Sequence, residues 1–327
     1  MALVDEFIAR ARKNPRRVVL PEGNDPQIVQ AACRLAGEGI ARPVLLGTPQ
    51  EVCRLADGRP LDGIHLVDPA DPGCLERYAS LYAAHRDGVV TAGSALRVVR
   101  RPLMLAAMMV AAGDADAMVA GISKPTAQVI SAATLAIGLR EGVRQPSSFF
   151  IMVLQGPPER ALVYADCAVT VDPGAAELAQ IAVLTARNAR LLLGIEPKVA
   201  LLSFSTRGSA AHPRVDKVRR AVELARELDP DLLLDGELQA DAALSPRVAA
   251  RKCADSPLEG AANVLVFPDL DTANVAYKLT QYLAGAQAIG PVMQGFRLPV
   301  NDLSRGATAS DIVGVVAIAS LQVGAAG

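Results

Sequence analysis

One seven-residue segment of this chain, Ser203–Ser209, gathers side chains that suit phosphate binding. It carries four hydroxyl groups, a guanidinium and a glycine, directly after an apolar run. A guanidinium can bind a phosphate through two parallel hydrogen bonds, and glycine lets backbone approach a ligand closely. An ordinary polar connection is the competing interpretation. On the first interpretation the residues that contact substrate are Ser203, Ser205, Thr206, Arg207 and Gly208.

A second segment, 121–126, places Ser123, Lys124 and Thr126 where a helix is expected to begin. Free amides at a helix start attract anions, so this segment can hold a phosphate or carboxylate. The glycine spacing and the GKS/T order of a P-loop are absent. A hydroxyl-capped helix with a solvated lysine is an equally good interpretation.

Two further segments carry carboxylates. In 301–311, which begins with Asn301, Thr308 and Asp311 have the spacing of a capping box before an apolar helix, so Asp311 also has a purely structural interpretation. The segment 235–241 holds three carboxylates after an apolar run. They could serve acid–base chemistry, bind a metal or form a solvated acidic turn.

Short apolar runs alternate with helical patterns along most of the chain, and the loops above follow several of these runs. Near-continuous apolar strands are typical of parallel sheets covered on both faces, and their alternation with helices predicts an α/β fold. Asp25 followed by Pro26 predicts a helix start, and the spacing of apolar residues predicts another helix over 173–193. The expected strands are 17–21, 43–46, 116–120, 149–153, 198–203, 232–235 and 263–267.

Composition excludes several classes of function. The chain has 33 basic and 34 acidic residues, a net charge of −1, so it lacks the positive excess of a nucleic-acid binder. Its longest uncharged stretch, 279–296, contains glycine, proline and three glutamines and is a poor membrane span. The five cysteines are scattered and odd in number, and the start of the chain lacks a signal-peptide pattern. We therefore expect a cytoplasmic protein with reduced thiols, no metal site, and neither nucleic acid nor membrane as partner.

The combined segments resemble the phosphate acetyltransferase family, over nearly the whole chain. The resemblance is carried by SFSTRGS, DGELQADAAL, NVLVFPDLDTANVAYKL and GPVMQGFRLPVNDLSRGATASDIV. It implies a two-domain α/β fold like that of isocitrate and isopropylmalate dehydrogenases, with an interdomain cleft, usually as a homodimer. It also implies an enzyme that interconverts acetyl-CoA and phosphate with acetyl phosphate and CoA. In this reaction CoA is a substrate, and no bound cofactor is expected.

The resemblance also implies roles for individual residues. In the family the aspartate at position 311 takes the CoA thiol proton, and the pair Ser304–Arg305 steadies charge on the reacting acyl phosphate. Residues 205–208 line the substrate cleft, with Arg207 where the family often has lysine. Lys124 stands where the family has histidine, and Ser131 replaces a phosphate-binding arginine, so Lys124 is expected to supply positive charge. Arg86 is the nearest match to a second family arginine.

Polar Gly/Pro-containing stretches predict the domain boundaries. Residues 1–146 and 297–327 are expected to form a first, discontinuous α/β domain, and 147–296 a second. Three other functions stay open: the same chemistry on propionyl or butyryl groups, a non-catalytic acyl-CoA-sensing domain, and a dehydrogenase of the same fold. The dehydrogenase would need a nicotinamide site and a metal at 235–241. A covalent route through Cys167 is disfavoured against a buried structural thiol.

Overall fold

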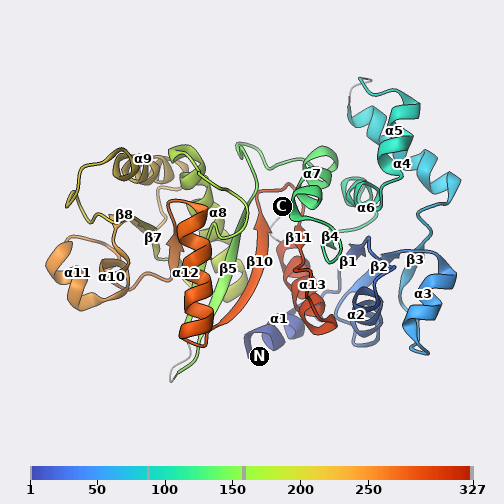
Figure 1. The fold of residues 1–327 in the computed structure, drawn as a ribbon, viewed down its shortest axis with the longest axis horizontal. Helices are drawn as coiled ribbons and strands as arrows, with labels where there is room; N and C mark the ends of the chain where they lie inside the picture. The colour runs from blue at the N-terminus through green and yellow to red at the C-terminus, as the bar shows by residue number, and fades with distance from the viewer. Residues whose placement is uncertain (1, 87–88, 157–159, 325–327) are drawn as a thin grey trace. The chain divides into compact units, whose positions relative to one another are not determined.

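The computed structural model describes residues 2–86, 89–156 and 160–324, in which the chain divides into two compact units. Unit 1 comprises residues 1–141 and 296–327, and unit 2 comprises 142–295. The chain therefore leaves unit 1 once and returns to it near its end. Each unit has its own sheet, and Figure 1 labels the elements of both.

The sheet of unit 1 has five parallel strands in the order β11-β4-β1-β2-β3. Its strands β1, β2 and β4 read RVVL, RPVLL and AMVA and are buried almost throughout, as a sheet covered on both faces requires. The last strand in sequence, β11, joins the edge beside β4. The bounds are β1 Arg17–Leu20, β2 Arg42–Leu46, β3 His65–Val67, β4 Ala117–Ala120 and β11 Val300–Asp302.

Helices cover both faces of this sheet: α2 and α13 pack on one side and α6 and α7 on the other (Figure 1). Helix α2 begins as expected, with Asp25 accepting hydrogen bonds from the amides of Gln27 and Ile28. The bounds in unit 1 are α1 Ala2–Ala11, α2 Pro26–Gly37, α3 Pro49–Ala56, α4 Pro72–His85, α5 Ala92–Val99, α6 Pro102–Ala111, α7 Thr126–Ala136 and α13 Ala309–Val323.

The sheet of unit 2 has six strands in the order β10-β5-β6-β9-β7-β8. Strands β6, β9, β7 and β8 are parallel, whereas β5 runs antiparallel to both β6 and β10. The bounds are β5 Ser147–Leu154, β6 Arg160–Ala165, β7 Val199–Leu202, β8 Leu234–Leu238, β9 Val264–Val266 and β10 Gln287–Gln294.

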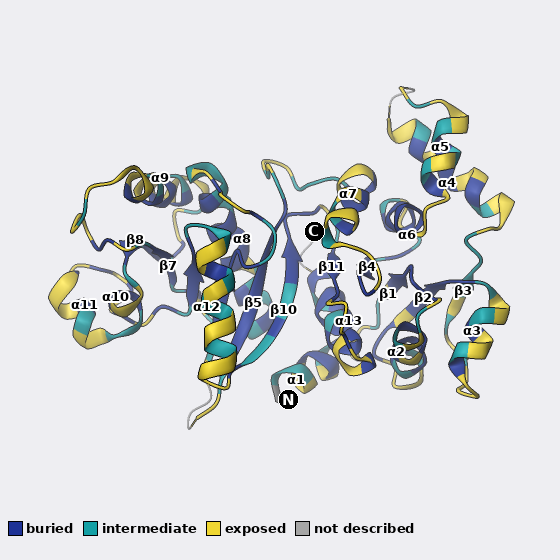
Figure 2. Cartoon of the chain, viewed as in Figure 1, coloured by how far each residue is buried: buried dark blue, intermediate teal, exposed yellow. Residues whose placement is uncertain are grey.

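Alternate residues of these strands face two helical layers. Phe150, Leu162 and Leu265 belong to a buried cluster on the side of α10 and α12. Helices α8 and α9 pack against each other; α8 also contacts β6 and β9, and α9 contacts β7 and β8. The strands are mostly dark blue in Figure 2, with half-buried stretches in β10, while α12 shows a long exposed face. The bounds are α8 Ala175–Leu193, α9 Pro213–Leu228, α10 Ala240–Leu244, α11 Pro246–Lys252 and α12 Leu270–Leu283.

All seven expected strands are present, and the expected α/β class is confirmed. The expectation of parallel pairing is wrong for the strand at 149–153, because an apolar run reveals burial but not the direction of its neighbours. No helix among the described residues is long and apolar enough to cross a membrane, and the stretch 279–296 instead contributes the end of α12 and strand β10.

Candidate active site

The loop after β4, which carries Lys124, is fixed by a buried carboxylate from the loop after β1. Glu22 is 3% exposed and accepts hydrogen bonds from the amides of Gly121, Ile122 and Ser123 at 2.7, 3.2 and 2.8 Å. Its Oε1 also accepts from the Ser123 hydroxyl at 2.7 Å. Glu22 therefore positions a segment that contains the exposed amino group of Lys124.

A second buried carboxylate holds the other end of this loop. Asp302, at the end of β11, is 3% exposed, and its Oδ2 accepts a hydrogen bond from the hydroxyl of Thr126, the first residue of α7. Its other oxygen, Oδ1, is buried with no hydrogen-bond partner among the described residues. A Cβ added at Gly121 would lie 2.1 Å from that Oδ1, and the φ of Gly121 is +115°. Only glycine permits this approach.

The environment of Asp302 disfavours its charged form. Burial raises the pKa of Asp302 to about 6, although the Thr126 hydroxyl and the nearby Leu303 amide oppose this shift, and the negative charge of Glu22 adds to it. A carboxyl group that titrates close to neutral pH lies two residues before Ser304.

The predicted catalytic pair Ser304–Arg305 lies on an exposed turn between β11 and α13. The Ser304 carbonyl accepts from the Ala307 amide at 3.0 Å, which closes the turn. Arg305 makes no ion pair with any carboxylate that the structure describes, so its charge is available to an anion.

The capping interpretation of Asp311 is confirmed. Its Oδ2 accepts from the Thr308 amide at 2.9 Å and from the Thr308 hydroxyl at 2.7 Å, and the Asp311 amide donates back to that hydroxyl. Asp311 is nevertheless exposed, and these bonds engage only one of its two oxygens. The second oxygen can still accept a proton.

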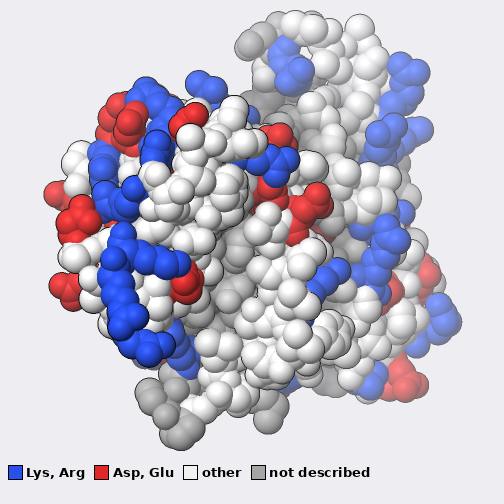
Figure 3. Space-filling model, turned by 60° about the vertical axis from the view of Figure 1, so that its left-hand side comes forward, with Lys and Arg blue, Asp and Glu red and all other residues white. Residues whose placement is uncertain are grey.

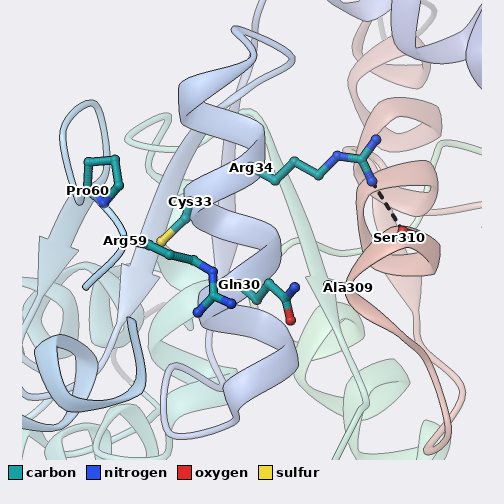
Figure 4. Close-up of a pocket in the computed structure, with 7 residues that line it drawn as sticks. All are labelled: Gln30, Cys33, Arg34, Arg59, Pro60, Ala309 and Ser310. Carbon is teal, nitrogen blue, oxygen red and sulfur yellow. Dashed lines mark hydrogen bonds between the residues drawn. The ribbon is translucent and has the colours of Figure 1, made fainter. Parts of the chain in front are cut away.

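A cavity of about 280 Å³ adjoins the start of α13 and contains two guanidinium groups that the sequence analysis does not single out (Figure 4). Arg34 donates to the Ser310 hydroxyl at 3.2 Å and also pairs with Glu38. Arg59 extends from the neighbouring segment toward Gln30. Positive charge is thus placed beside the helix that carries Asp311.

Asn301 and Arg86 take different positions in unit 1. Asn301 is fully buried, and its amide donates to Gln322 Oε1 at 2.8 Å, so it braces β11 against α13. Arg86 is exposed at the end of α4, where its own backbone amide closes the helix. The structure does not bring either side chain into contact with Lys124, Ser304 or Arg305.

In unit 2 the segment 203–209 folds onto β8, and most of its polar groups are engaged. Ser205 and Thr206 are buried; Ser205 donates to Glu237 Oε1 at 2.8 Å, and Thr206 donates to Gln239 at 3.2 Å. The Gly208 amide also donates to Glu237 at 2.8 Å. Ser203 is half-buried, and its hydroxyl accepts from the Ser205 amide. What the segment presents to solvent is chiefly Phe204, Arg207, Gly208 and Ser209.

Cations neutralise the acidic segment 235–241. Arg207 pairs with the buried Asp235 at 2.9 Å, Arg219 pairs with Glu237 at 2.9 Å, and Lys252 pairs with Asp241 at 2.8 Å. Burial alone would raise the pKa of Glu237, but hydrogen bonds from the Gly208 amide, Arg219 and Ser205 outweigh it and lower that pKa. No group of three or more potential ligands that could hold a metal occurs among the described residues. Basic and acidic side chains lie beside one another at several places on the face shown in Figure 3.

Cys167 is a structural thiol. It is fully buried, its Sγ donates to the Tyr164 carbonyl, and burial together with the charge of Asp166 raises its pKa well above the ordinary value. A thiol in this state is a poor nucleophile.

The fold defines the class of protein first. A putative 4-hydroxythreonine-4-phosphate dehydrogenase from Salmonella typhimurium is similar in structure, with a TM-score of 0.54 at 14% identity over 94% of this chain and 99% of that chain. A branched-chain phosphotransacylase from Enterococcus faecalis has a TM-score of 0.69 at 20% identity, with the same coverage. The chain therefore has a two-unit, dehydrogenase-like α/β fold.

Closer relatives identify the family. The model for phosphate acetyl/butaryl transferase matches residues 2–320, and the chain belongs to this family of acyltransferase enzymes. It is 43% identical to a phosphate acetyltransferase from Thermoanaerobacterium thermosaccharolyticum, over 98% of this chain and 99% of the relative. It is also similar to a phosphotransacetylase structure from Streptococcus pyogenes, with a TM-score of 0.94 at 40% identity and 98% coverage of both chains.

Sequence reasoning missed Glu22 and Asp302 as site residues, although Asp302 lies in the segment 301–311 that it considered. The available signal was a carboxylate at or just after the end of a buried strand: Asp302 ends β11, and Glu22 lies two residues after β1. Burial and an unpartnered oxygen become visible only when β4 and β11 pair side by side.

Proposed function

We propose that this chain interconverts acetyl-CoA and phosphate with acetyl phosphate and CoA. One observation carries the catalytic part of the proposal: Arg305 is exposed without an ion-pair partner among the described residues, on the turn that leads into α13 and Asp311. The relatives named above are phosphate acetyltransferases of nearly the same length, which supports acetyl as the acyl group.

In the proposed mechanism the CoA sulfur attacks the carbonyl carbon of acetyl phosphate. A C–S bond forms, the C–O bond to phosphate breaks, and the thiol proton passes through Asp311 to the departing phosphate. A free thiol has a pKa near 8.5 and a free aspartate one near 3.9, so transfer to Asp311 is uphill by about 6 kcal/mol in water. Arg305 reduces this cost because it stabilises the thiolate as it forms, and attack concerted with proton transfer reduces it further.

Asp311 can accept that proton on the oxygen that Thr308 leaves unengaged. Ser304 and Arg305 are the proposed donors to the oxyanion that develops on the carbonyl oxygen. One such donor is typically worth about 3 kcal/mol of transition-state stabilisation.

Other residues are proposed to hold the substrates. Lys124 supplies a cation two residues before the start of α7, where the Thr126 hydroxyl holds the loop through its bond to Asp302, and Arg86 is a further candidate cation. In unit 2 we propose that Arg207 and Gly208 contact the substrate directly. The buried side chains Ser205, Thr206 and Asn301 shape the segments around them, and Ser203 anchors its own loop.

We further propose a homodimer formed through α12. Its exposed side chains Val275, Leu279, Tyr282 and Leu283 are 52–81% exposed and recur at helical spacing, which leaves an apolar stripe in water. The same helix packs its other side on β5, where Tyr277 stacks on Phe150. All five cysteines are free, which supports the cytoplasm as the location.

The first experiment is consumption of CoA thiol by the purified chain with acetyl, propionyl or butyryl phosphate. We expect the acyl group to be transferred to the CoA sulfur, and we expect this turnover to be fastest with acetyl phosphate. Faster turnover of butyryl phosphate would contradict the acetyl assignment, and no turnover of any acyl phosphate would contradict the reaction.

The second experiment tests the site. Arg305→Ala should reduce kcat about a hundredfold or more, because a charged donor to the transition state is lost. Arg54→Ala is the matched control, since Arg54 is an exposed arginine on α3 of the same unit. Equal kcat in the two variants would remove Arg305 from the mechanism.

A further inference from the structure

Two buried carboxylates hold the loop 121–126 from its two ends. Glu22 binds the amides at the beginning of the loop, and Asp302 binds the Thr126 hydroxyl at its end. The roles of these carboxylates differ in one respect. Each oxygen of Glu22 accepts hydrogen bonds, whereas Oδ1 of Asp302 has no partner among the described residues.

An unpartnered buried carboxylate oxygen is costly, and it requires a structural reason. The backbone of Gly121 packs closely on this oxygen. Gly121 has a φ of +115°, and any side chain at position 121 would collide with Oδ1. Oδ1 itself is buried from solvent. Strand pairing adds to the constraint, because Asp302 is opposite Ala120 in the β11–β4 ladder.

Asp302 is also the direct link between two segments of the proposed site. Through its side chain it contacts Thr126, two residues after Lys124, and through the backbone it leads to Ser304 and Arg305. The Leu303 amide, which follows Asp302, donates to the Ala120 carbonyl at 2.8 Å. Movement of Asp302 would therefore move a predicted anion-binding loop and the catalytic pair together.

We propose that Asp302 is a positioning residue for acyl transfer: it fixes the Lys124–Thr126 loop against the Ser304–Arg305 turn, and its negative charge weakens the binding of anionic acyl phosphate. The charge part of this proposal rests on the proposed acyltransferase activity. Asp302 is 3% exposed, so we assign it an action through Thr126 and the Ser304–Arg305 turn rather than direct contact with substrate.

The charge of Asp302 is adjustable within the physiological range. Burial first, and the charge of Glu22 in addition, raise its pKa to about 6. Glu22 is the ionisable group that faces it from another element; Lys124, Arg305 and Asp311 are exposed on the loop after β4 and on its own segment. Asp302 is hence mainly neutral at pH 5 and mainly charged at pH 8.

The test compares KM for acetyl phosphate at pH 5 and pH 8 in the wild type and in Asp302→Asn. Asparagine removes the charge and keeps an oxygen for Thr126. At an effective dielectric constant between 20 and 80, two like charges separated by roughly 10 Å repel each other enough to weaken anion binding about twofold to fifteenfold. We expect the KM of Asp302→Asn to be lower than that of the wild type by this factor at pH 8 and equal to it at pH 5.

The comparison of the two chains cancels the titration of acetyl phosphate itself. Asp116→Asn is the matched control, because Asp116 lies just before β4 and pairs with Arg17 on the surface. The quantity compared is the KM of each variant divided by that of the wild type. If this ratio does not change with pH for Asp302→Asn, or changes equally for Asp116→Asn, the charge part of the proposal is overturned.

A second variant tests the positioning part without altering any charge. Thr126→Val removes the hydroxyl that Asp302 binds, and we expect kcat to fall about tenfold or more because reacting groups lose alignment. Thr48→Val is the control, since Thr48 precedes α3 and makes no side-chain capping bond. An unchanged kcat in Thr126→Val would overturn the positioning role.

The two proposals fail in distinguishable ways. A wild type that turns over no acyl phosphate would refute the proposed function. The buried charge would still be tested by urea unfolding of the wild type and Asp302→Asn at two pH values, which needs no substrate. Equal pH dependence of stability in both chains would then overturn the role of the charge.

Discussion

Asp302→Asn is expected to change the pH dependence of stability in a direction opposite to that of most surface carboxylates. The pKa of Asp302 is about 6 in the folded chain, against an ordinary value of 3.8. The folded state therefore binds the proton more tightly than the unfolded state. The resulting penalty is present above about pH 6, fades as the pH falls, and is absent below about pH 4.

The size of this effect follows from the difference between those two pKa values. A difference of about 2.2, at 1.36 kcal/mol per pH unit, corresponds to about 3 kcal/mol. Asparagine carries no such penalty, although its amide protons add a cost that does not vary with pH. The stability of Asp302→Asn relative to the wild type should thus rise by about 2 kcal/mol between pH 4 and pH 7, most of the full difference.

Urea unfolding followed by far-UV circular dichroism at pH 4, 5, 6 and 7 measures this difference. Asp116 provides a control of opposite sign: hydrogen bonds from Arg17 outweigh burial and lower its pKa. Its contribution to stability is present above the ordinary aspartate pKa and is lost as the pH falls. A free-energy difference between Asp302→Asn and the wild type that is constant from pH 4 to pH 7 would refute a raised pKa at Asp302.

Three other predictions concern Gly121, the helix cap at Asp311 and the exposed face of α12. Gly121→Ala should lower the free energy of unfolding by about 3 kcal/mol or more, since the new Cβ meets Asp302 and the backbone is strained; Gly113→Ala, with φ +80° and nothing within 4 Å, should cost only about 1 kcal/mol, as thermal unfolding would show. Asp311→Asn should retain the helix cap, with stability within about 1 kcal/mol of the wild type, while kcat falls about a hundredfold; lost stability with retained kcat would leave Asp311 as a cap alone. Leu279→Lys on the exposed face of α12 should convert a dimer into a monomer in light scattering, and an unchanged mass would exclude this face as the interface.

The local sequence predicts the elements of this fold better than their partners. Apolar runs located seven strands correctly, and Asp25 with Pro26 located the start of α2, because burial and helix capping are decided within a few residues. Antiparallel pairing of β5 with β10 joins residues more than a hundred positions apart, and no local pattern encodes it. The sequence predicts domain boundaries after residues 146 and 296, and the two units of the structure divide after residues 141 and 295.

The candidate site shows the same division. The capping box at Thr308 and Asp311 is visible in the sequence because it spans four residues. The unpartnered oxygen of Asp302 depends on Gly121, which is remote in the chain and adjacent only across the β4–β11 pair. Arg207 was expected as a ligand for phosphate, and its pairing with the buried Asp235 depends likewise on the alignment of β7 with β8.

The discontinuity of unit 1 has a consequence for synthesis on the ribosome. Unit 2 is one continuous stretch, whereas β11 and α13, which complete unit 1 beside β4, are made only after all of unit 2. The nascent N-terminal segment must therefore wait, with the edge of β4 uncovered and the faces of α1 and α2 that contact α13 unpaired, until β11 and α13 have been made. An unpaired strand edge of this kind invites aggregation and chaperone binding. Synthesis of residues 296–327, rather than emergence of the first 141 residues, is then the step at which the proposed catalytic residues Ser304, Arg305 and Asp311 can first be assembled.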